Sequence, residues 1–328
     1  MSGAPRLVVI AGPTASGKTA LACALAGPLS AEIVSADSQQ CYRGLDAGTA
    51  KPGPAERALA PHHLLDVADP EEQLDAASFV RLADAALAGI AARGKNALVV
   101  GGTGLWIRAL LRGLLDAPGA DPEFRARFRD ELRERGLAAL HARLAQVDPE
   151  AAAAIRPGDR VRIERALEVH AATGRPLSEL QRAHGFARPR YAARVVLLDP
   201  PAELLRERIA RRTEALFGGG GDAPLVRETR ALLHRIERIP AAAKALKIIG
   251  YGETAAALRE PGADFAGALR RALEATASRT RRYAKRQRTW FRKDAPALDA
   301  LRSPALASDA TDAARLCGAL REWYDAAG

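Results

Sequence analysis

The chain has 328 residues, 48% of them hydrophobic, which is enough for one large or two modest domains with buried cores. No apolar run is long enough to span a bilayer, and the N-terminus lacks the pattern of a secretory signal, so we expect a soluble cytoplasmic protein. The net charge of +10 is compatible with polyanionic partners, although the predominance of Arg could equally reflect a coding bias, and three scattered cysteines argue against a disulfide framework or a zinc site.

Short β-like runs alternate with longer helical stretches, and this alternation predicts an α/β fold with a parallel sheet flanked by helices. Each expected strand is followed by a polar or glycine-containing loop. In open α/β sheets the ligand binds at the carboxyl ends of the strands, so we expect these loops to form the site. The expected core strands are Leu7–Ala11, Glu32–Ser35, Ala97–Val100 and Arg194–Leu198.

The loop after the first expected strand, residues 12–19, has the full spacing of a P-loop between a strand and a helix. Its glycines let successive N–H groups point at phosphate oxygens, and the dipole of the following helix adds to the attraction. Lys18 supplies a positive charge, and Thr19 can place its hydroxyl on Mg²⁺. The residues expected to bind a diphosphate or triphosphate are Gly12, Pro13, Thr14, Ala15, Ser16, Gly17, Lys18 and Thr19. Kinases and other NTPases share this motif, which leaves the chemistry open.

No strand pattern is present between residues 118 and 189, so we expect a helical insertion there, between core segments 1–117 and 190–328. Its amphipathic stretches are Pro122–Arg135, Leu137–Gln146, Arg160–Ala172 and Pro176–His184. After Pro201 the pattern is again mainly helical, with one short strand expected around Ala297–Leu301. Gly218–Gly221 is expected to form a flexible loop.

The segment Asp37–Pro52, after the second expected strand, resembles a signature of the tRNA dimethylallyltransferase (tRNA isopentenyltransferase) family. Further segments that resemble the family follow in order: Pro61–Asp66, Val100–Trp106, Arg162–Val169, Ile249–Tyr251 and Ala284–Arg292. The resemblance implies a P-loop NTPase-like fold with Mg²⁺ as cofactor. It also implies transfer of a dimethylallyl group from dimethylallyl diphosphate to N6 of adenosine 37, 3′ to the anticodon of tRNA, with release of diphosphate.

The resemblance assigns catalytic roles to Asp37, Thr103 and Arg212. Asp37 would accept the N6 proton, although from the sequence alone it could equally be a helix N-cap or a Mg²⁺-shell carboxylate. Arg212 would clamp the departing diphosphate, and its neighbour Arg211 is the alternative. Thr103 would position the substrate near the reacting centre, and its alternative is an ordinary turn residue.

The target base must leave its stack, and proteins read such bases by stacking, hydrogen bonds and positive charge. The densest basic run, Arg279–Lys293, also contains the adjacent aromatic pair Trp290 and Phe291, one of which helical periodicity would put partly in the core. Arg125, Arg162 and Arg165 could equally be ordinary surface arginines. The tRNA contacts implied by the resemblance are Asp37, Ser38, Gln39, Gln40, Thr103, Arg125, Val161, Arg162, Ile163, Glu164, Arg165, Lys247, Gly250, Tyr251, Lys285, Arg286, Gln287, Arg288, Thr289, Trp290, Phe291 and Arg292.

Two other functions share parts of this pattern. A nucleoside or nucleotide kinase would use the P-loop to bind ATP and phosphorylate a small acceptor. A non-catalytic RNA-binding ATPase would need no base at Asp37. The helical insertion with its arginines and the segment Asp37–Pro52 argue against the kinase, and analysis of the tRNA nucleosides would separate the ATPase from a transferase. We expect a monomer that binds the anticodon stem-loop, and His62 and His63 are expected to be structural because no metal-ligand spacing surrounds them.

Overall fold

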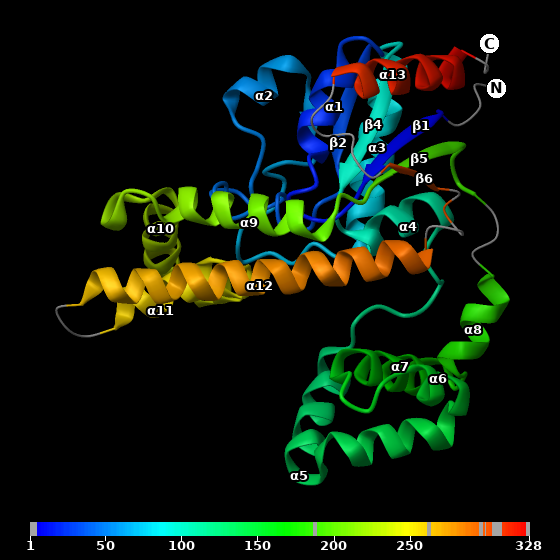
Figure 1. Cartoon of the computed structure of the whole chain (residues 1–328). Helices are drawn as coiled ribbons and strands as arrows, with labels where there is room; N and C mark the ends of the chain where they lie inside the picture. Colours follow the sequence, from blue (N-terminus) through cyan, green and yellow to red (C-terminus); the bar gives the residue numbers. More distant parts are fainter. Residues whose placement is uncertain are drawn as a thin grey trace. The chain divides into compact units, whose positions relative to one another are not determined.

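The computed structural model describes residues 5–185, 189–260, 264–294, 298, 300–303 and 310–325. The chain divides into two compact units, Met1–Leu111 with Arg190–Gly328, and Arg112–Pro189 (Figure 1). The second unit begins a few residues before the insertion boundary expected from the sequence. No helix in the described residues is long and apolar enough to cross a membrane.

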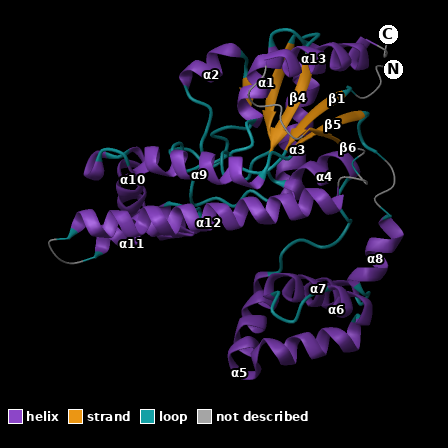
Figure 2. Cartoon of the chain, in the orientation of Figure 1, coloured by secondary structure: helices purple, strands orange, loops and turns teal. Residues whose placement is uncertain are grey.

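The first unit contains a six-stranded parallel sheet with the order β3-β2-β4-β1-β5-β6 (Figure 2). The strands are β1 (Leu7–Ala11), β2 (Ala31–Ser35), β3 (His62–His63), β4 (Asn96–Gly101), β5 (Ala193–Leu198) and β6 (Ala300–Ser303). The four strands expected in the core are confirmed, with ends that shift by at most one residue. The fifth expected strand overlaps β6, although Ala297, where it was expected to begin, lies outside the described residues.

Strand β1 lies inside the sheet, between β4 and β5. Leu7 pairs with Ala97 of β4 on one side and with Ala193 of β5 on the other. All of β1 is buried, as is typical of a parallel strand covered on both faces, and this explains its continuous apolar sequence. The chain therefore changes direction along the sheet at β1, which is where ligands of such sheets bind.

Helices cover both faces of the sheet. Helices α3 (Ala76–Ala92) and α4 (Gly104–Arg112) pack on one face, where Phe79 and Trp106 stack with ring centroids 4.4 Å apart. Helices α1 (Lys18–Ala26) and α13 (Ala310–Asp325) pack on the other face. The short helix α2 (Pro54–Leu59) follows β2.

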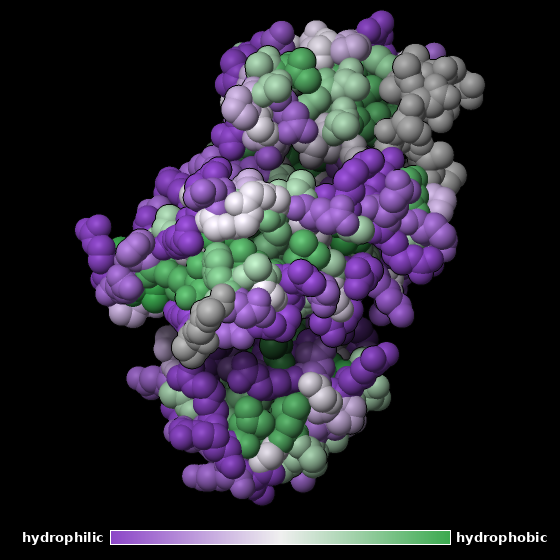
Figure 3. All heavy atoms as spheres, turned by 60° about the vertical axis from the view of Figure 1, so that its left-hand side comes forward, coloured by the Kyte–Doolittle hydropathy of each residue, from purple (hydrophilic) through white to green (hydrophobic). Residues whose placement is uncertain are grey.

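A helical layer follows β5 and has its own apolar cluster, which includes Leu225 and Tyr251. It consists of α9 (Ala202–Phe217), η1 (Gly220–Asp222), α10 (Pro224–Arg238), η2 (Pro240–Lys247), α11 (Tyr251–Arg259) and α12 (Phe265–Asp294). The expected glycine loop, Gly218–Gly221, thus overlaps the short 3₁₀ helix η1. Helix α12 runs beside α9 and α11 (Figure 1). Hydrophilic side chains predominate on the face of the molecule drawn in Figure 3.

The second unit is entirely helical in its described residues (Figure 2). Its helices are α5 (Pro122–Val147), α6 (Pro149–Ala154), α7 (Arg160–Thr173) and α8 (Leu177–His184). The two helices expected at its start are joined in α5, which is kinked at Gly136 with φ 76° and ψ 166°. Phe128, Leu140 and Ile163 are central to its separate apolar core.

Candidate active site

The P-loop leaves β1 through backbone conformations that favour glycine. Gly12 has a φ of 152°, and a Cβ there would lie 2.5 Å from the carbonyl oxygen of Leu198. Gly17 caps helix α1 with a φ of 96°, in the left-handed region. Ala15 also has a positive φ, 63°, which is strained for a residue with a side chain. The loop is therefore held tightly around the start of α1.

Two polar side chains of the P-loop, those of Lys18 and Ser16, could bind an anion. The Lys18 ammonium donates to the Pro13 carbonyl oxygen at 2.7 Å. Burial lowers the pKa of Lys18 to about 8, the nearby Asp37 carboxylate raises it, and Arg212 lowers it further. The hydroxyl of Ser16 is buried and has no hydrogen-bond partner in the described part of the chain. A phosphate oxygen would satisfy both groups.

A cavity of about 610 Å³ opens above the P-loop, within the range of small-molecule sites. Most of its polar lining comes from the loops after β1 and β2 and from helix α9. Its lining residues include Thr14, Ala15, Gly17, Lys18, Thr19, Asp37, Gln40, Glu56, Gly101, Arg208, Arg211 and Arg212. The predicted phosphate loop, general base and arginine clamp thus line one cavity.

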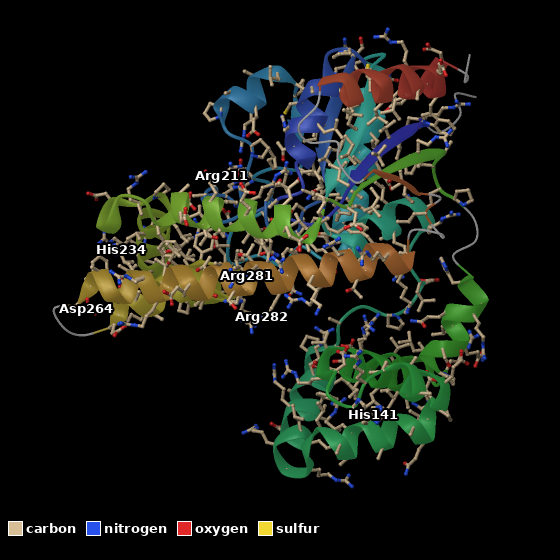
Figure 4. All side chains as sticks on the ribbon, in the orientation of Figure 1. His141, Arg211, His234, Asp264, Arg281 and Arg282 are labelled. Atoms are coloured by element: carbon tan, nitrogen blue, oxygen red, sulfur yellow. The ribbon has the colours of Figure 1, made fainter. Side chains whose placement is uncertain are left out.

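Burial distinguishes Arg212 from Arg211, the two candidates for the predicted clamp. Arg212 donates to the Thr14 hydroxyl and to the Gly48 carbonyl oxygen, each at 3.1 Å. Burial lowers the pKa of Arg212, while Asp37 acts in the opposite direction. Arg211 lines the same cavity from α9, but it is exposed (Figure 4). Arg208, which the sequence did not single out, donates to the Ser16 carbonyl oxygen at 3.4 Å.

Asp37 and Thr103 come from loops after neighbouring strands and meet through Ser38. One Asp37 oxygen, Oδ1, accepts the backbone N–H of Gln39 at 2.9 Å within a turn, and because the next described helix begins only at Pro54, Asp37 is not a helix N-cap. The other, Oδ2, makes no hydrogen bond with the described residues and remains able to accept a proton. Thr103 Oγ1 accepts the Ser38 N–H at 2.9 Å and donates to the Ser38 hydroxyl at 3.2 Å. Thr103 therefore holds the turn that carries Asp37.

A second cavity, of about 210 Å³, shares part of its wall with the first. The shared residues are Thr14, Asp37, Thr49 and Arg212. The remaining wall includes Gln39, Lys247, Arg279, Tyr283 and Arg286. Tyr283 was not predicted, and burial raises the pKa of its phenol, with a further rise from Asp37. Asp37 and Arg212 are thus accessible from two cavities.

Several side chains expected to contact tRNA lie inside the protein. Ile163, Tyr251 and Phe291 are at most 2% exposed, so the expectation that these side chains contact tRNA is wrong. Tyr251 instead donates its hydroxyl to Glu228, and its ring packs on Gly48. Gly250, also buried, caps helix α11 with its N–H bonded to the Glu253 side chain.

Polar members of the expected tRNA set are also used within the protein. The Gln40 amide donates to the Ala50 carbonyl oxygen at 2.8 Å and so braces its own loop. Gln287 is 6% exposed and bonds to two loops of the site. Trp290 is partly buried against Gly104, where a Cβ would lie 2.1 Å from its ring.

The charged members fall into paired and unpaired groups. Arg125 and Arg165 both bind Glu168, and Arg288 and Arg292 both bind Asp199. Arg162 pairs with Asp159, and the exposed cations of this expected set that have no ion pair with described residues are Lys247, Lys285 and Arg286. The remaining expected residues, Val161, Arg162 and Thr289, are exposed, and Glu164 is partly exposed.

The cavity above the P-loop contains oxygen donors suited to a hard cation. The Thr19 hydroxyl lines it, together with the carboxylates of Asp37 and Glu56. Mg²⁺ in such sites uses one or two protein oxygens and takes the rest from phosphates and water. No group of three metal-ligating residues exists among the described residues, and this includes the region of His62 and His63. His63 instead bonds to Glu32 at 2.7 Å.

Family models and curated relatives that match this chain all describe isopentenyl or dimethylallyl transferases. A family model described as IPP transferase matches residues 40–294, and one described as isopentenyl transferase matches residues 5–66. The tRNA dimethylallyltransferase of Anaeromyxobacter sp. (strain K) is 57% identical over 88% of this chain and 90% of its own length. That of Myxococcus xanthus is 50% identical, with the same coverages.

Solved structures extend the similarity. The full-length tRNA isopentenylpyrophosphate transferase from Bacillus halodurans is 33% identical, with a TM-score of 0.66 over 98% of this chain and 96% of that one. A eukaryotic dimethylallyltransferase acting on tRNA is 25% identical, with a TM-score of 0.81 over 98% of this chain and 80% of that one.

Proposed function

The chain belongs to the IPP transferase family, and we propose that it transfers a dimethylallyl group from dimethylallyl diphosphate to N6 of adenosine 37 in tRNA. The observation that carries this proposal is one cavity lined by a P-loop, by Asp37 and by Arg212. We assign diphosphate binding to the P-loop and the role of the base to Asp37. The protein acts as a monomer in the cytoplasm, with tRNA as its macromolecular partner.

The leaving group determines the need for cations. As the allylic C–O bond breaks, its electron pair and a full negative charge move onto the diphosphate. Lys18 and Arg212 hold positive charge in the cavity before the reaction, so little reorganisation is needed at that moment. Thr19 would hold a Mg²⁺ ion, which adds positive charge at the phosphate oxygens when bound.

The nucleophile determines the need for a base. The N6 lone pair of adenine is delocalised into the ring, so the nitrogen attacks only as its proton is removed. The new C–N bond forms at the allylic carbon, and the proton passes to the free oxygen of Asp37, Oδ2. Thr103 acts through Ser38 to keep the Asp37 turn in place.

RNA recognition is assigned to exposed positive charge. Lys247 and Arg286 line the second cavity beside Asp37, and Lys285 lies exposed next to Arg286. The helical unit supplies further exposed cations such as Arg162. We propose that these residues contact the anticodon stem-loop while the target adenine leaves its stack.

Ligand-induced thermal protection separates this function from its rivals. Dimethylallyl diphosphate with Mg²⁺ should raise the melting temperature of the wild-type protein, and Lys18→Ala should lose that protection because the phosphate site is weakened. A kinase or an RNA-binding ATPase would be protected by ATP instead. Strong protection by ATP with none by dimethylallyl diphosphate would overturn the proposal.

A further inference from the structure

Gln287 lies in the basic segment of helix α12 and yet points into the protein. Its side chain is 6% exposed, whereas the preceding Arg286 is exposed. Ala284, Gln287 and Phe291 form one buried stripe, with the spacing of a helix face that packs against a core. The partners of Gln287 must therefore be sought inside the first unit.

Both ends of the Gln287 amide are bonded to the active-site loops. Its Oε1 accepts the backbone N–H of Thr14 at 2.8 Å, and its Nε2 donates to the carbonyl oxygen of Gly102 at 2.9 Å. A backbone N–H can only donate and a carbonyl can only accept, so these partners fix the orientation of the amide. A Cβ at Gly102 would lie 2.3 Å from Nε2, so this approach needs a glycine.

Of the two loops bonded to Gln287, one lies on the side of the leaving diphosphate and the other on the side of the proposed base. They follow β1 and β4, which are neighbouring strands. The Thr14 hydroxyl accepts from Arg212 at 3.1 Å, on the diphosphate side. Thr103, next to Gly102, accepts the Ser38 N–H at 2.9 Å, on the side of the base. One buried amide thus joins the leaving-group side of the site to the side that removes the proton.

We propose that Gln287 is a positioning residue that fixes the spacing between the P-loop and the Thr103 loop, and that it does not contact tRNA. The inference rests on the proposed function, because the groups that it spaces are those of prenyl transfer. Correct spacing keeps N6 in line with the breaking C–O bond. A misplacement of about 1 Å can cost about 100-fold in rate, without a comparable loss in binding.

Two variants disrupt the bridge that Gln287 forms between the Thr14 and Gly102 backbones, one by changing Gln287 and the other by changing Gly102. Gln287→Met removes both hydrogen bonds at similar volume, and Gly102→Ala pushes the amide away while leaving Gln287 intact. Each should lower kcat by about 10- to 100-fold, while KM for tRNA stays within about twofold of wild type. The control is Gln73→Met, the same substitution at an exposed position outside the site, which should behave as wild type.

The double variant is the sharpest measurement. Because both changes break the same bridge, Gln287→Met with Gly102→Ala should be hardly slower than the worse single variant. An unchanged kcat with a raised KM for tRNA in Gln287→Met would mean direct RNA contact and overturn the inference. If Gln287→Met fails to fold, as judged by circular dichroism, Gly102→Ala provides the test. An inactive wild type would contradict the proposed function, whereas an active wild type with unimpaired variants would contradict only the bridge.

Discussion

Lys18 and Arg212 are cations whose burial disfavours their positive charge. Burial lowers the pKa of each group, and the carboxylate of Asp37 partly compensates for both. Charges fixed in advance and partly removed from water act strongly on a developing negative charge. The two side chains should therefore attract an incoming diphosphate strongly.

The lowered pKa of Lys18 predicts how diphosphate binding depends on pH. The ammonium form binds the anion better than the amine, and the free protein loses this proton as the pH rises through about 8. Affinity for inorganic diphosphate should therefore weaken above pH 8, by up to about tenfold per pH unit. Calorimetric titration from pH 6.5 to 9.5 checks this, with Lys18→Arg as the control because its charge persists and the titration of the ligand itself cancels.

Asp37→Asn tests the proposed base. Asparagine keeps the size and much of the hydrogen bonding but cannot take the N6 proton, so the single-turnover rate should fall by about 10²- to 10⁴-fold. Binding of dimethylallyl diphosphate and of tRNA should survive. Loss of Mg²⁺ or diphosphate binding would instead make Asp37 a metal-shell ligand, and an unchanged rate would mean that the base lies elsewhere.

The sequence suggests candidate site residues where they lie in contiguous motifs. The P-loop and Asp37 belong to runs whose spacing carries their chemistry. Arg208 and Tyr283 could not be predicted, because each reaches the cavities from a helix without a motif. The choice between Arg211 and Arg212 depended on burial, which adjacent residues of one helix do not reveal in sequence.

At the scale of elements, the buried strands were predictable because they are continuously apolar. Strand β3 was missed because its two residues, His62 and His63, are too few to show a period. In α12 the basic composition concealed a buried face. Ala284, Gln287 and Phe291 recur at helical spacing, so periodicity could have identified Gln287 as an inward-pointing residue.

Helix α12 should make tRNA binding depend on salt. Lys285 and Arg286 are exposed and have no ion pair in the described chain, so contacts with phosphates would release condensed counterions. A plot of log affinity against log salt should have a negative slope, and Lys285→Ala with Arg286→Ala should make it shallower by about 1 to 2.

The control for that measurement is Lys95→Ala, which removes an exposed charge just before β4, at the amino end of the sheet. This variant should keep the wild-type slope. Equal slopes in all three proteins would mean that the exposed side of α12 faces away from RNA.

The close approach of the ends of the paired strands β2 and β4 should depend on Gly101. A Cβ there would lie 2.1 Å from the carbonyl oxygen of Ala36, and neither backbone can yield easily. Gly101→Ala should therefore cost about 1–3 kcal/mol of folding free energy, through overpacking. Urea denaturation measures this against Gly27→Ala, where nothing lies within 4 Å of a Cβ and little change is expected. Equal midpoints for the two variants would contradict the close packing.

At the scale of the whole molecule, the fold brings together loops that are far apart in the chain. The P-loop, the Asp37 turn and the Thr103 loop follow β1, β2 and β4, and the parallel sheet places these strand ends along one edge. Helices α9 and α12 then add Arg212 and Gln287 from the C-terminal half. The α/β class followed from strand periodicity, whereas the contribution of each helix depends on long-range packing that periodicity does not encode.

Mass analysis of tRNA nucleosides tests the central claim most directly. The wild-type protein is incubated with Mg²⁺, dimethylallyl diphosphate and an unmodified tRNA that carries adenosine at position 37, and the tRNA is then digested to nucleosides. We predict N6-dimethylallyladenosine with release of diphosphate, and none when guanosine replaces adenosine 37. Absence of the prenylated nucleoside with a folded, diphosphate-binding protein, or equal product from the guanosine-37 tRNA, would contradict transfer to N6 of that adenosine.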